Sequence, residues 1–445
     1  MIKKMVIANR GEIALRIIRA AHEMGIKTVM VYSKADQDSL PVRLADESYC
    51  IGLEKSSESY MRYQNILTVA LSSKADAIHP GYGFLSENPD FAELCKAVGL
   101  IFIGPSPESI TLMGDKAKAR ETMIKAGVPI SPGSDGNLGG VEQAVELSRK
   151  IGFPLIIKAS AGGGGKGMRI ARSEVELINN IQIAQTEAKS AFGDASIYVE
   201  RYIENPNHIE VQILGDQQGH VVHLGERDCS VQRRYQKLIE ETPSPKITPE
   251  IREKLGASAI KAAQACGYYS TGTVEFLVDQ NREIYFIEMN TRIQVEHPIT
   301  ESITGLDLIK EQIRVAEGNP LSFTQSQIQF RGHSMECRIN AEDPEKNFRP
   351  CPGLIEQIIF PGGPGVRIDS AVYPGYVIPP YYDSMIAKVI VHTPSRQESI
   401  VKMKRALREF VLEGVKSTIP FLLQILENQD FTRGTYSTHL IEKML

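Results

Sequence analysis

Two runs rich in β-forming residues, 273–279 and 284–290, are separated only by the polar residues 280–283. This pattern predicts a β-hairpin with a four-residue loop. In such a hairpin Asp279 faces Ile284, and every pair further from the loop is fixed by counting outward. The hairpin therefore commits this part of the chain to an antiparallel sheet with a defined register.

This register brings oxygen-bearing side chains together. Glu275 is expected directly opposite Glu288, and Asn290 shares the face of Glu288 because side chains alternate along a strand. Opposed carboxylates destabilise a sheet unless positive charge lies between them, and carboxylate and amide oxygens suit Mg²⁺ or Mn²⁺. The hairpin predicts a metal site at these three residues. The alternative is a hairpin with one hydrated face, on which both glutamates point to water.

A polar cluster directly after Asn290 favours the metal site over that alternative. It contains Arg292, Gln294, Glu296 and His297. A hydrated surface rarely concentrates an arginine, a further carboxylate and a metal-type triad within so short a segment.

The first 114 residues alternate between strand and helix patterns, which predicts a parallel, doubly wound, Rossmann-like sheet. Helical spacing of apolar residues, as at Ile13, Ile17 and Ala20, marks the helices. The expected strands cover 5–9, 27–33, 77–79 and 100–104, and the expected helices cover 11–25, 60–73 and 90–98.

The pattern changes after residue 114 and again after residue 330, so three domains are expected: 1–114, 115–330 and 331–445. The fold class is α/β and α+β multidomain. The middle domain should carry a smaller α+β unit over about 131–203, which its glycine-rich loop would make a mobile lid. The last domain is rich in β-strands and Pro–Gly turns and should close with two helices.

The glycine-rich loop at 162–165 follows a strand that contains Lys158. A loop with almost no Cβ atoms can turn backbone N–H groups toward phosphate oxygens. Four glycines alone are typical of a flexible turn, but the nearby lysines favour phosphate. The Walker motif is absent because Gly167 follows Lys166, and the first strand lacks the dinucleotide fingerprint.

Composition excludes several classes of protein. Fifty Lys and Arg against 54 Asp and Glu give a net charge of −4, so nucleic acid and anionic membranes are not expected partners. The six cysteines lack metal-type spacing and are expected as reduced thiols. Neither a long apolar run nor a signal-peptide core is found, which predicts a cytoplasmic protein.

Long motifs in a fixed order carry a family resemblance. They are HPGYGFLSEN, FIGPS, MGDK, IIKAS with its glycine loop, ERDCSVQRR, EMNTRIQVEHP, ECRINAEDP and PPYYDSMIAK. The chain resembles the biotin carboxylase subunit or domain of biotin-dependent carboxylases, such as acetyl-CoA carboxylase of fatty acid biosynthesis, in the ATP-grasp superfamily. The resemblance runs from Met5 almost to the C-terminus. It implies a Rossmann-like N-terminal domain, an ATP-grasp domain with a glycine-rich lid and a β-rich C-terminal domain.

The resemblance also implies a reaction and its partners. Such ligases use ATP to convert bicarbonate to carboxyphosphate, whose CO₂ carboxylates N1′ of biotin. The implied ligands are ATP, Mg²⁺ or Mn²⁺ at two sites, and carrier-bound biotin. The family's carrier segment centres on Met-Lys-Met, whereas this chain has only Lys402-Met403-Lys404. A separate biotin carboxyl carrier protein, carboxyltransferase subunits and a homodimer are therefore expected.

Position by position, the resemblance assigns roles to individual residues. Glu296 would be the general base, with Arg292, Arg338 and Lys237 as further catalytic residues. Bicarbonate would contact Lys237, Arg292, Gln294 and the backbone of Val295, biotin would contact Arg338 and Tyr82, and the metal would contact Glu275, Glu288 and Asn290. ATP would contact Lys116, Lys158, Gly164, Gly165, Glu200, Arg201, Tyr202, Ile203, His208, Gln232, Tyr235, Lys237, Glu275 and Glu288.

Some alternatives stay open at this stage. Glu296 could form an ordinary ion pair with Arg292, and Arg338 could be a structural bridge to Glu336. Tyr235 stands where the family often has histidine, so we expect a nucleotide contact there and no proton transfer. Two other functions also compete: another ATP-dependent ligase that forms an acyl phosphate, and a nucleotide-binding regulatory module without catalysis.

Overall fold

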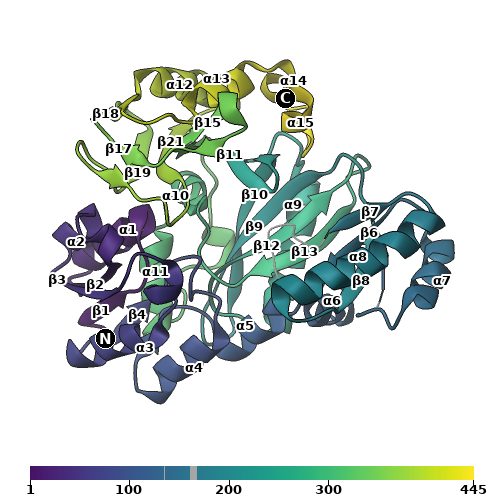
Figure 1. Cartoon of the computed structure of the whole chain (residues 1–445), viewed down its shortest axis with the longest axis horizontal. Helices are drawn as coiled ribbons and strands as arrows, with labels where there is room; N and C mark the ends of the chain where they lie inside the picture. Colours follow the sequence, from purple (N-terminus) through teal and green to yellow (C-terminus); the bar gives the residue numbers. More distant parts are fainter. Residues whose placement is uncertain (135, 161–167) are drawn as a thin grey trace.

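The computed structural model describes residues 1–134, 136–160 and 168–445 (Figure 1). Its N-terminal part is a parallel sheet of strand order β3-β2-β1-β4-β5, which confirms the doubly wound prediction. The strands are β1 (Lys4–Ile7), β2 (Lys27–Ser33), β3 (Glu47–Gly52), β4 (Ala77–His79) and β5 (Ile101–Phe102). The helices around them are α1 (Gly11–Glu23), α2 (Leu40–Leu44), α3 (Tyr63–Ser72), α4 (Pro89–Ala97) and α5 (Pro107–Gly114).

Helix α1 shows why this part of the sequence folds as it does. Its residues Ile13, Ile17 and Ala20 recur at helical spacing and are fully buried against the sheet and helix α11 (Leu308–Ala316). Gly11, at the start of the helix, has φ +66°, a conformation that other residues rarely adopt. The turn before α1 therefore depends on this glycine.

A smaller α+β unit follows helix α6 (Lys116–Lys125) and lies to one side of the molecule in Figure 1. It is an antiparallel sheet of order β7-β6-β8 covered by two helices. Its elements are α7 (Val141–Ile151), β6 (Leu155–Ala159), β7 (Arg169–Ala171), α8 (Glu174–Phe192) and β8 (Ile197–Arg201). Leu155, Ile157, Leu177 and Ile181 belong to the separate core of this unit.

One eight-stranded antiparallel sheet forms the centre, in the order β13-β12-β9-β10-β11-β14-β21-β19. Its strands are β9 (Asn207–Gly215), β10 (Val221–Arg233), β11 (Gln236–Thr242), β12 (Ser270–Val278), β13 (Ile284–Asn290), β14 (His333–Asn340), β19 (Val366–Ser370) and β21 (Met385–Thr393). Helices α9 (Pro249–Ala265) and α10 (His297–Thr304) pack against it. The sheet crosses residue 330, because β11 pairs with β14.

The C-terminal part closes with more helices than expected. Four follow β21: α12 (Arg396–Glu409), α13 (Ile419–Glu427), α14 (Gln429–Arg433) and α15 (Leu440–Met444). The prediction of two was wrong because α14 and α15 are only five residues long and carry little periodic signal. Their apolar residues Phe431 and Leu440 are nevertheless buried in the same core as β14 and β21.

Two further expectations from the sequence concerned the state of the cysteines and membrane-spanning helices. All six cysteines are free thiols. Within the described ranges, every helix is too short or too polar to serve as a membrane span.

A candidate active site at the centre of the large sheet

The β12–β13 hairpin has a longer loop than the sequence predicted. Ile284 pairs with Val278 and does not face Asp279. The reason lies in the Asp279 side chain, whose Oδ1 accepts the backbone N–H groups of Asn281 and Glu283, both at 2.9 Å. This Asx-type turn takes Asp279 out of the strand.

The predicted pairing of Glu275 with Glu288 is nevertheless confirmed. The register shifts by one residue at Ile287, and this bulge cancels the error at the loop. Glu275 is almost completely buried, whereas the Glu288 side chain is 33% exposed. The alternative in which both glutamates point to water is therefore wrong.

Glu275 is held by neighbours from three strands and the segment after them. Its Oε2 lies 2.8 Å from Nε2 of His208, and its Oε1 lies 3.3 Å from Nζ of Lys237. Asn290 and Gln294 donate to Oε1 at 2.9 and 3.3 Å. Burial alone would raise the pKa of Glu275, but Lys237 and His208 outweigh it and lower the pKa far below its usual range. Glu275 is thus an anion that its cationic neighbours stabilise.

Lys237 is the centre of the charge network. Its Nζ lies 2.6 Å from Glu210, 3.3 Å from Glu275 and 2.6 Å from Glu296. Burial would lower the pKa of Lys237, but its acidic neighbours raise it well above its usual value. The ammonium therefore stays charged with three carboxylates around it.

Glu210 is a site residue that the sequence reasoning missed. It is fully buried and also accepts from Nε of Arg227 at 2.5 Å. A signal was available in the sequence. His208, Glu210 and Gln212 alternate with apolar residues along β9, and residues at this spacing share one face of a strand. A polar stripe on a buried strand is typical of a site.

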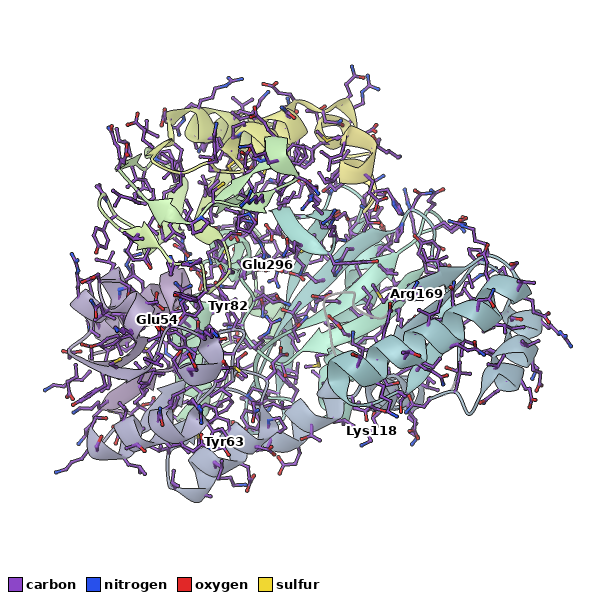
Figure 2. The ribbon with its side chains drawn as sticks, viewed as in Figure 1. Glu54, Tyr63, Tyr82, Lys118, Arg169 and Glu296 are labelled. Carbon is purple, nitrogen blue, oxygen red and sulfur yellow. The ribbon has the colours of Figure 1, made fainter. Side chains whose placement is uncertain are left out.

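Glu296 bridges two cations. Its Oε1 pairs with Lys237, and its Oε2 accepts from Nη2 of Arg338 at 2.9 Å. Burial would raise the pKa of Glu296, but Lys237 and Arg338 lower it well below its usual range. Figure 2 labels Glu296 near the middle of the molecule, and this residue directly precedes α10.

Arg338 also pairs with Glu240, a second site residue that the sequence reasoning missed. Its Nε and Nη2 lie 2.6 and 2.5 Å from Oε1 of Glu240 on β11. Burial raises the pKa of Glu240 to about 7, since Arg338 offsets the burial only in part. Arg338 therefore contacts Glu240 and Glu296. The alternative left open by the sequence, a bridge from Arg338 to Glu336, is wrong.

Arg292 pairs with Glu87, so its alternative pairing with Glu296 is also wrong. Its Nε lies 2.8 Å from Oε2 of Glu87, in the N-terminal part of the chain. Its other nitrogens donate to Oδ1 of Asn290 at 2.9 Å and Oε1 of Gln294 at 3.3 Å. Glu87 lies in the motif HPGYGFLSEN, but its partner is 205 residues away, and sequence reasoning could not join them.

The residues expected to contact ATP form separate pairs around this centre. Nζ of Lys116, at the start of α6, lies 3.0 Å from Glu288. Nζ of Lys158, on β6, lies 3.1 Å from Glu200. Burial would raise the pKa of Glu200, but Lys158 and Arg120 lower it. Both lysines are thus paired with carboxylates on neighbouring elements.

The remaining expected ATP contacts are more dispersed. Arg201, Tyr202 and Ile203 lie at and just after the end of β8. Gln232 pairs across β10 and β11 with Lys237. Tyr235 lies in the turn between these strands and is 60% exposed. Gly164 and Gly165 lie outside the described residues.

Tyr82, expected at biotin, contacts Glu12, which the sequence reasoning did not single out. Its hydroxyl donates to Oε1 of Glu12 at 2.5 Å. Both side chains line a cavity of about 200 Å³ that is also bordered by Arg10 and Asp383. Tyr82 thus lies on the wall of a small cavity between the N-terminal part and the segment before β21.

The donor set of the hairpin fits a hard divalent cation. Glu275 and Glu288 bring carboxylate oxygens from adjacent strands, and Asn290 adds an amide oxygen. Lys116 and Lys237 now provide the positive charge that opposed carboxylates need. Their presence shows that the carboxylates are arranged around cations and not toward bulk water.

Comparison with known proteins decides the family. The N-terminal domain model of biotin carboxylase matches residues 1–110, and its C-terminal domain model matches 336–443. The ATP-binding domain model of the carbamoyl-phosphate synthase L chain matches 115–324. Biotin carboxylase 1 of Bacillus subtilis is 60% identical over 443 residues, which cover 99% of this chain and 98% of the relative. The chain belongs to the biotin carboxylase family.

Other members of the biotin carboxylase family are similarly close. The biotin carboxylase of a Nostoc species is 56% identical over 441 residues, which cover 99% of both chains. The Campylobacter jejuni biotin carboxylase, solved as a β-γ-ATP complex, has a TM-score of 0.97 at 52% identity over 100% and 99% of the two chains. The biotin carboxylase domain dimer of Hydrogenobacter thermophilus 2-oxoglutarate carboxylase, solved with MgADP, ADP and bicarbonate, has a TM-score of 0.96 at 52% identity over 100% and 98%. The expected family and fold class are confirmed.

Proposed function

We propose that this chain is a ligase that carboxylates biotin with bicarbonate at the expense of ATP. The observation that carries the proposal is the bridging position of Glu296, with Lys237 on one oxygen and Arg338 on the other. One carboxylate placed between two cations suits two successive steps, the activation of bicarbonate and the carboxylation of biotin. The relatives are named as biotin carboxylases, and one of them is solved with bicarbonate.

In the first step Glu296 would act as the general base. Bicarbonate would lie against Lys237, Arg292 and Gln294, and its oxygen would attack the γ-phosphorus of ATP while Glu296 accepts its proton. A carboxylate with a strongly lowered pKa is a weak base. Bicarbonate bound to Lys237 would, however, share the charge that lowers this pKa, and the basicity of Glu296 would then rise.

Phosphoryl transfer depends mainly on positioning and charge. We propose that the triphosphate lies along Lys116, Lys158 and His208, beside Glu275 and Glu288. Mg²⁺ or Mn²⁺ would neutralise negative charge on the triphosphate. The metal would be held by Glu275, Glu288 and Asn290, at two sites as the family resemblance implies.

In the second step Arg338 would stabilise charge on biotin. Carboxyphosphate separates into CO₂ and phosphate, and phosphate accepts the proton from N1′. The ureido oxygen then gains negative charge, which the fixed guanidinium of Arg338 would stabilise better than mobile water. The deprotonated N1′ would then attack the carbon of CO₂ and form N1′-carboxybiotin. Tyr82 would line the biotin side of the site.

We propose a homodimer that acts on biotin held by a separate carrier protein and works with carboxyltransferase subunits. The Hydrogenobacter thermophilus relative was solved as a dimer, which supports the first part. Relatives named for pyruvate and 2-oxoglutarate carboxylation are 55% and 52% identical to this chain, similar to relatives named only biotin carboxylase. These identities do not favour acetyl-CoA over pyruvate or 2-oxoglutarate as the final acceptor. We also propose a cytoplasmic location. The proposed domain limits are 114/115 and 330/331, and the proposed lid covers about 131–203.

The test is a measurement of ATP hydrolysis with bicarbonate, with and without free biotin. Hydrolysis that requires bicarbonate and is stimulated by biotin supports the proposal. Turnover with another acid in place of bicarbonate would favour a different ATP-dependent ligase. No turnover with any acid would favour a regulatory nucleotide-binding module.

A further inference from the structure

A buried lysine outside the expected site lies next to Arg338 in the sheet. Lys388 on β21 is the direct partner of Arg338 on β14 and of Asp369 on β19. Its side chain is fully buried. Two cations opposite each other across a ladder repel, so a lysine at this position needs a specific reason.

The two cations hold neighbouring residues of one segment. Arg338 donates to the side chain of Glu296, and Nζ of Lys388 donates to the backbone carbonyl of Val295 at 2.8 Å. The segment 291–296 lies between β13 and α10 and is the part of the chain expected to bind bicarbonate. Lys388 therefore holds the backbone beside the proposed base.

Lys388 also reaches the wall of the cavity at Tyr82. Its Nζ lies 3.1 Å from Oε1 of Glu12, the same oxygen that accepts the hydroxyl of Tyr82 at 2.5 Å. Three contacts thus connect Val295, Lys388, Glu12 and Tyr82 in one series. Figure 2 labels Tyr82, which ends this series, and Glu296, which follows Val295 in the chain.

The charge of Lys388 depends mainly on Glu12. Asp369 is further away, at 3.8 Å, and already forms a bidentate pair with Arg367. Neither carboxylate oxygen of Glu336 has a hydrogen-bond partner within the described part of the chain. Burial would lower the pKa of Lys388, but Glu12 and Glu336 raise it, so the ammonium is charged.

We propose that Lys388 is a positioning residue of this site, which fixes the bicarbonate-binding segment through Val295 and the biotin-side wall through Glu12 and Tyr82. Lys388 touches neither substrate in this proposal and acts through the residues it holds. The inference rests on the proposed function and adds a residue to it.

The first variant is Lys388→Met, which keeps an unbranched side chain, shorter by the terminal nitrogen, and removes the donor and the charge. We expect KM for bicarbonate to rise about tenfold and kcat to fall about 10- to 100-fold, because small displacements of a reacting group have effects of this size. KM for ATP should not change, since the ATP-side lysines have other partners. A loss of folded protein alone would lower the apparent kcat and leave KM for bicarbonate unchanged.

Two further variants separate positioning from folding. The double variant Glu12→Gln/Lys388→Met balances the charge and leaves Tyr82 an amide oxygen to donate to, so it should regain stability but keep the raised KM for bicarbonate. Lys388→Arg keeps a charged donor and should recover part of the lost bicarbonate affinity. Lys402→Met is the matched control, because Nζ of Lys402 also donates to backbone carbonyls, those of Pro364 and His392, away from the site.

The results decide between two failures. If the unaltered protein lacks bicarbonate-dependent ATP hydrolysis, the proposed function is wrong. If the unaltered protein is active and the folded Lys388 variants keep its KM for bicarbonate, only the positioning role is wrong. A double variant with normal kinetics, or an Arg variant as impaired as the Met variant, also contradicts that role.

Discussion

Nη2 of Arg338 lies 2.9 Å from Oε2 of Glu296, although the two residues are 42 positions apart and belong to a strand and a helix start. This contact joins the C-terminal part of the chain to the segment after the metal-type hairpin. A carboxylate proposed as the base of the first step thus touches the guanidinium proposed to stabilise the second, so bicarbonate and biotin would meet at one place.

Replacing the proposed base should stop the first step. Glu296→Gln removes the proton acceptor, and bicarbonate-dependent ATP hydrolysis should fall about 100- to 1000-fold. ATP affinity, measured by titration, should stay within about twofold because the ATP-side pairs are intact. The control is Glu241→Gln, which also removes a buried carboxylate, one paired with Arg396 outside the site. Near-normal hydrolysis in the Glu296 variant would remove this residue from the mechanism.

Glu240 should influence the biotin step with a distinctive pH dependence. Burial raises the pKa of Glu240 to about 7, so the carboxyl is neutral below this pH and charged above it. Glu240→Gln imitates the neutral form and leaves Arg338 with Glu296 as its main charged partner. Biotin-dependent turnover of the variant should therefore lie below that of the unaltered protein at pH 8 and approach it at pH 6. A constant ratio of the two rates across this range would contradict the interpretation.

Metal dependence tests the hairpin directly. Glu288→Gln removes one carboxylate from the expected metal site, and the Mg²⁺ concentration for half-maximal ATP hydrolysis should rise about tenfold or more, by analogy with other changes around metal sites. Glu283→Gln is the matched control, since Glu283 is an exposed loop residue of the same hairpin. Equal Mg²⁺ requirements for the two variants would place the metal elsewhere.

Stability should depend on pH through Asp228, a buried carboxyl outside the proposed chemistry. Burial raises the pKa of Asp228 from 3.8 to about 6, in spite of hydrogen bonds from Ser230 and Ser244. A raised pKa means that the folded protein binds the proton more tightly, so stability is present below pH 3.8 and is lost as pH rises through about 6. The shift corresponds to roughly 3 kcal/mol.

Urea unfolding of the unaltered protein and of Asp228→Asn measures this loss. The free energy of unfolding of the unaltered protein, relative to the variant, should decrease between about pH 4 and pH 7 and level off above it. A difference that stays constant or grows over this range would show that Asp228 is already ionised in the folded state at low pH.

The sequence predicted the pairing of Glu275 with Glu288, although two local departures from the expected register lie between this pair and the loop. Glu275 and Glu288 face each other as expected, because a bulge at Ile287 compensates for the longer loop. The predicted loop length was wrong because the side chain of Asp279 accepts two backbone hydrogen bonds within the loop, and Asp279 is therefore not paired in the strand. Periodicity carries no information about such a bond.

The partners of the site residues were the hardest to predict. Glu87, Glu210 and Glu240 each complete an ion pair whose other member lies in a different element. Which carboxylate reaches which cation is set by tertiary packing, so the sequence offered Arg292 and Glu296 as partners only because they are neighbours. The chemistry of the site was therefore more predictable than the pairing of its charges.

The pairing of β11 with β14 joins the last quarter of the chain to its middle, from Ile239 opposite Cys337 to Thr242 opposite Ser334. A nick in the backbone between 325 and 332 would consequently leave two fragments held together, with Arg338 still beside Glu296. If the two fragments were produced separately, each would expose an unpaired sheet edge. Each fragment would then either bind the other or aggregate.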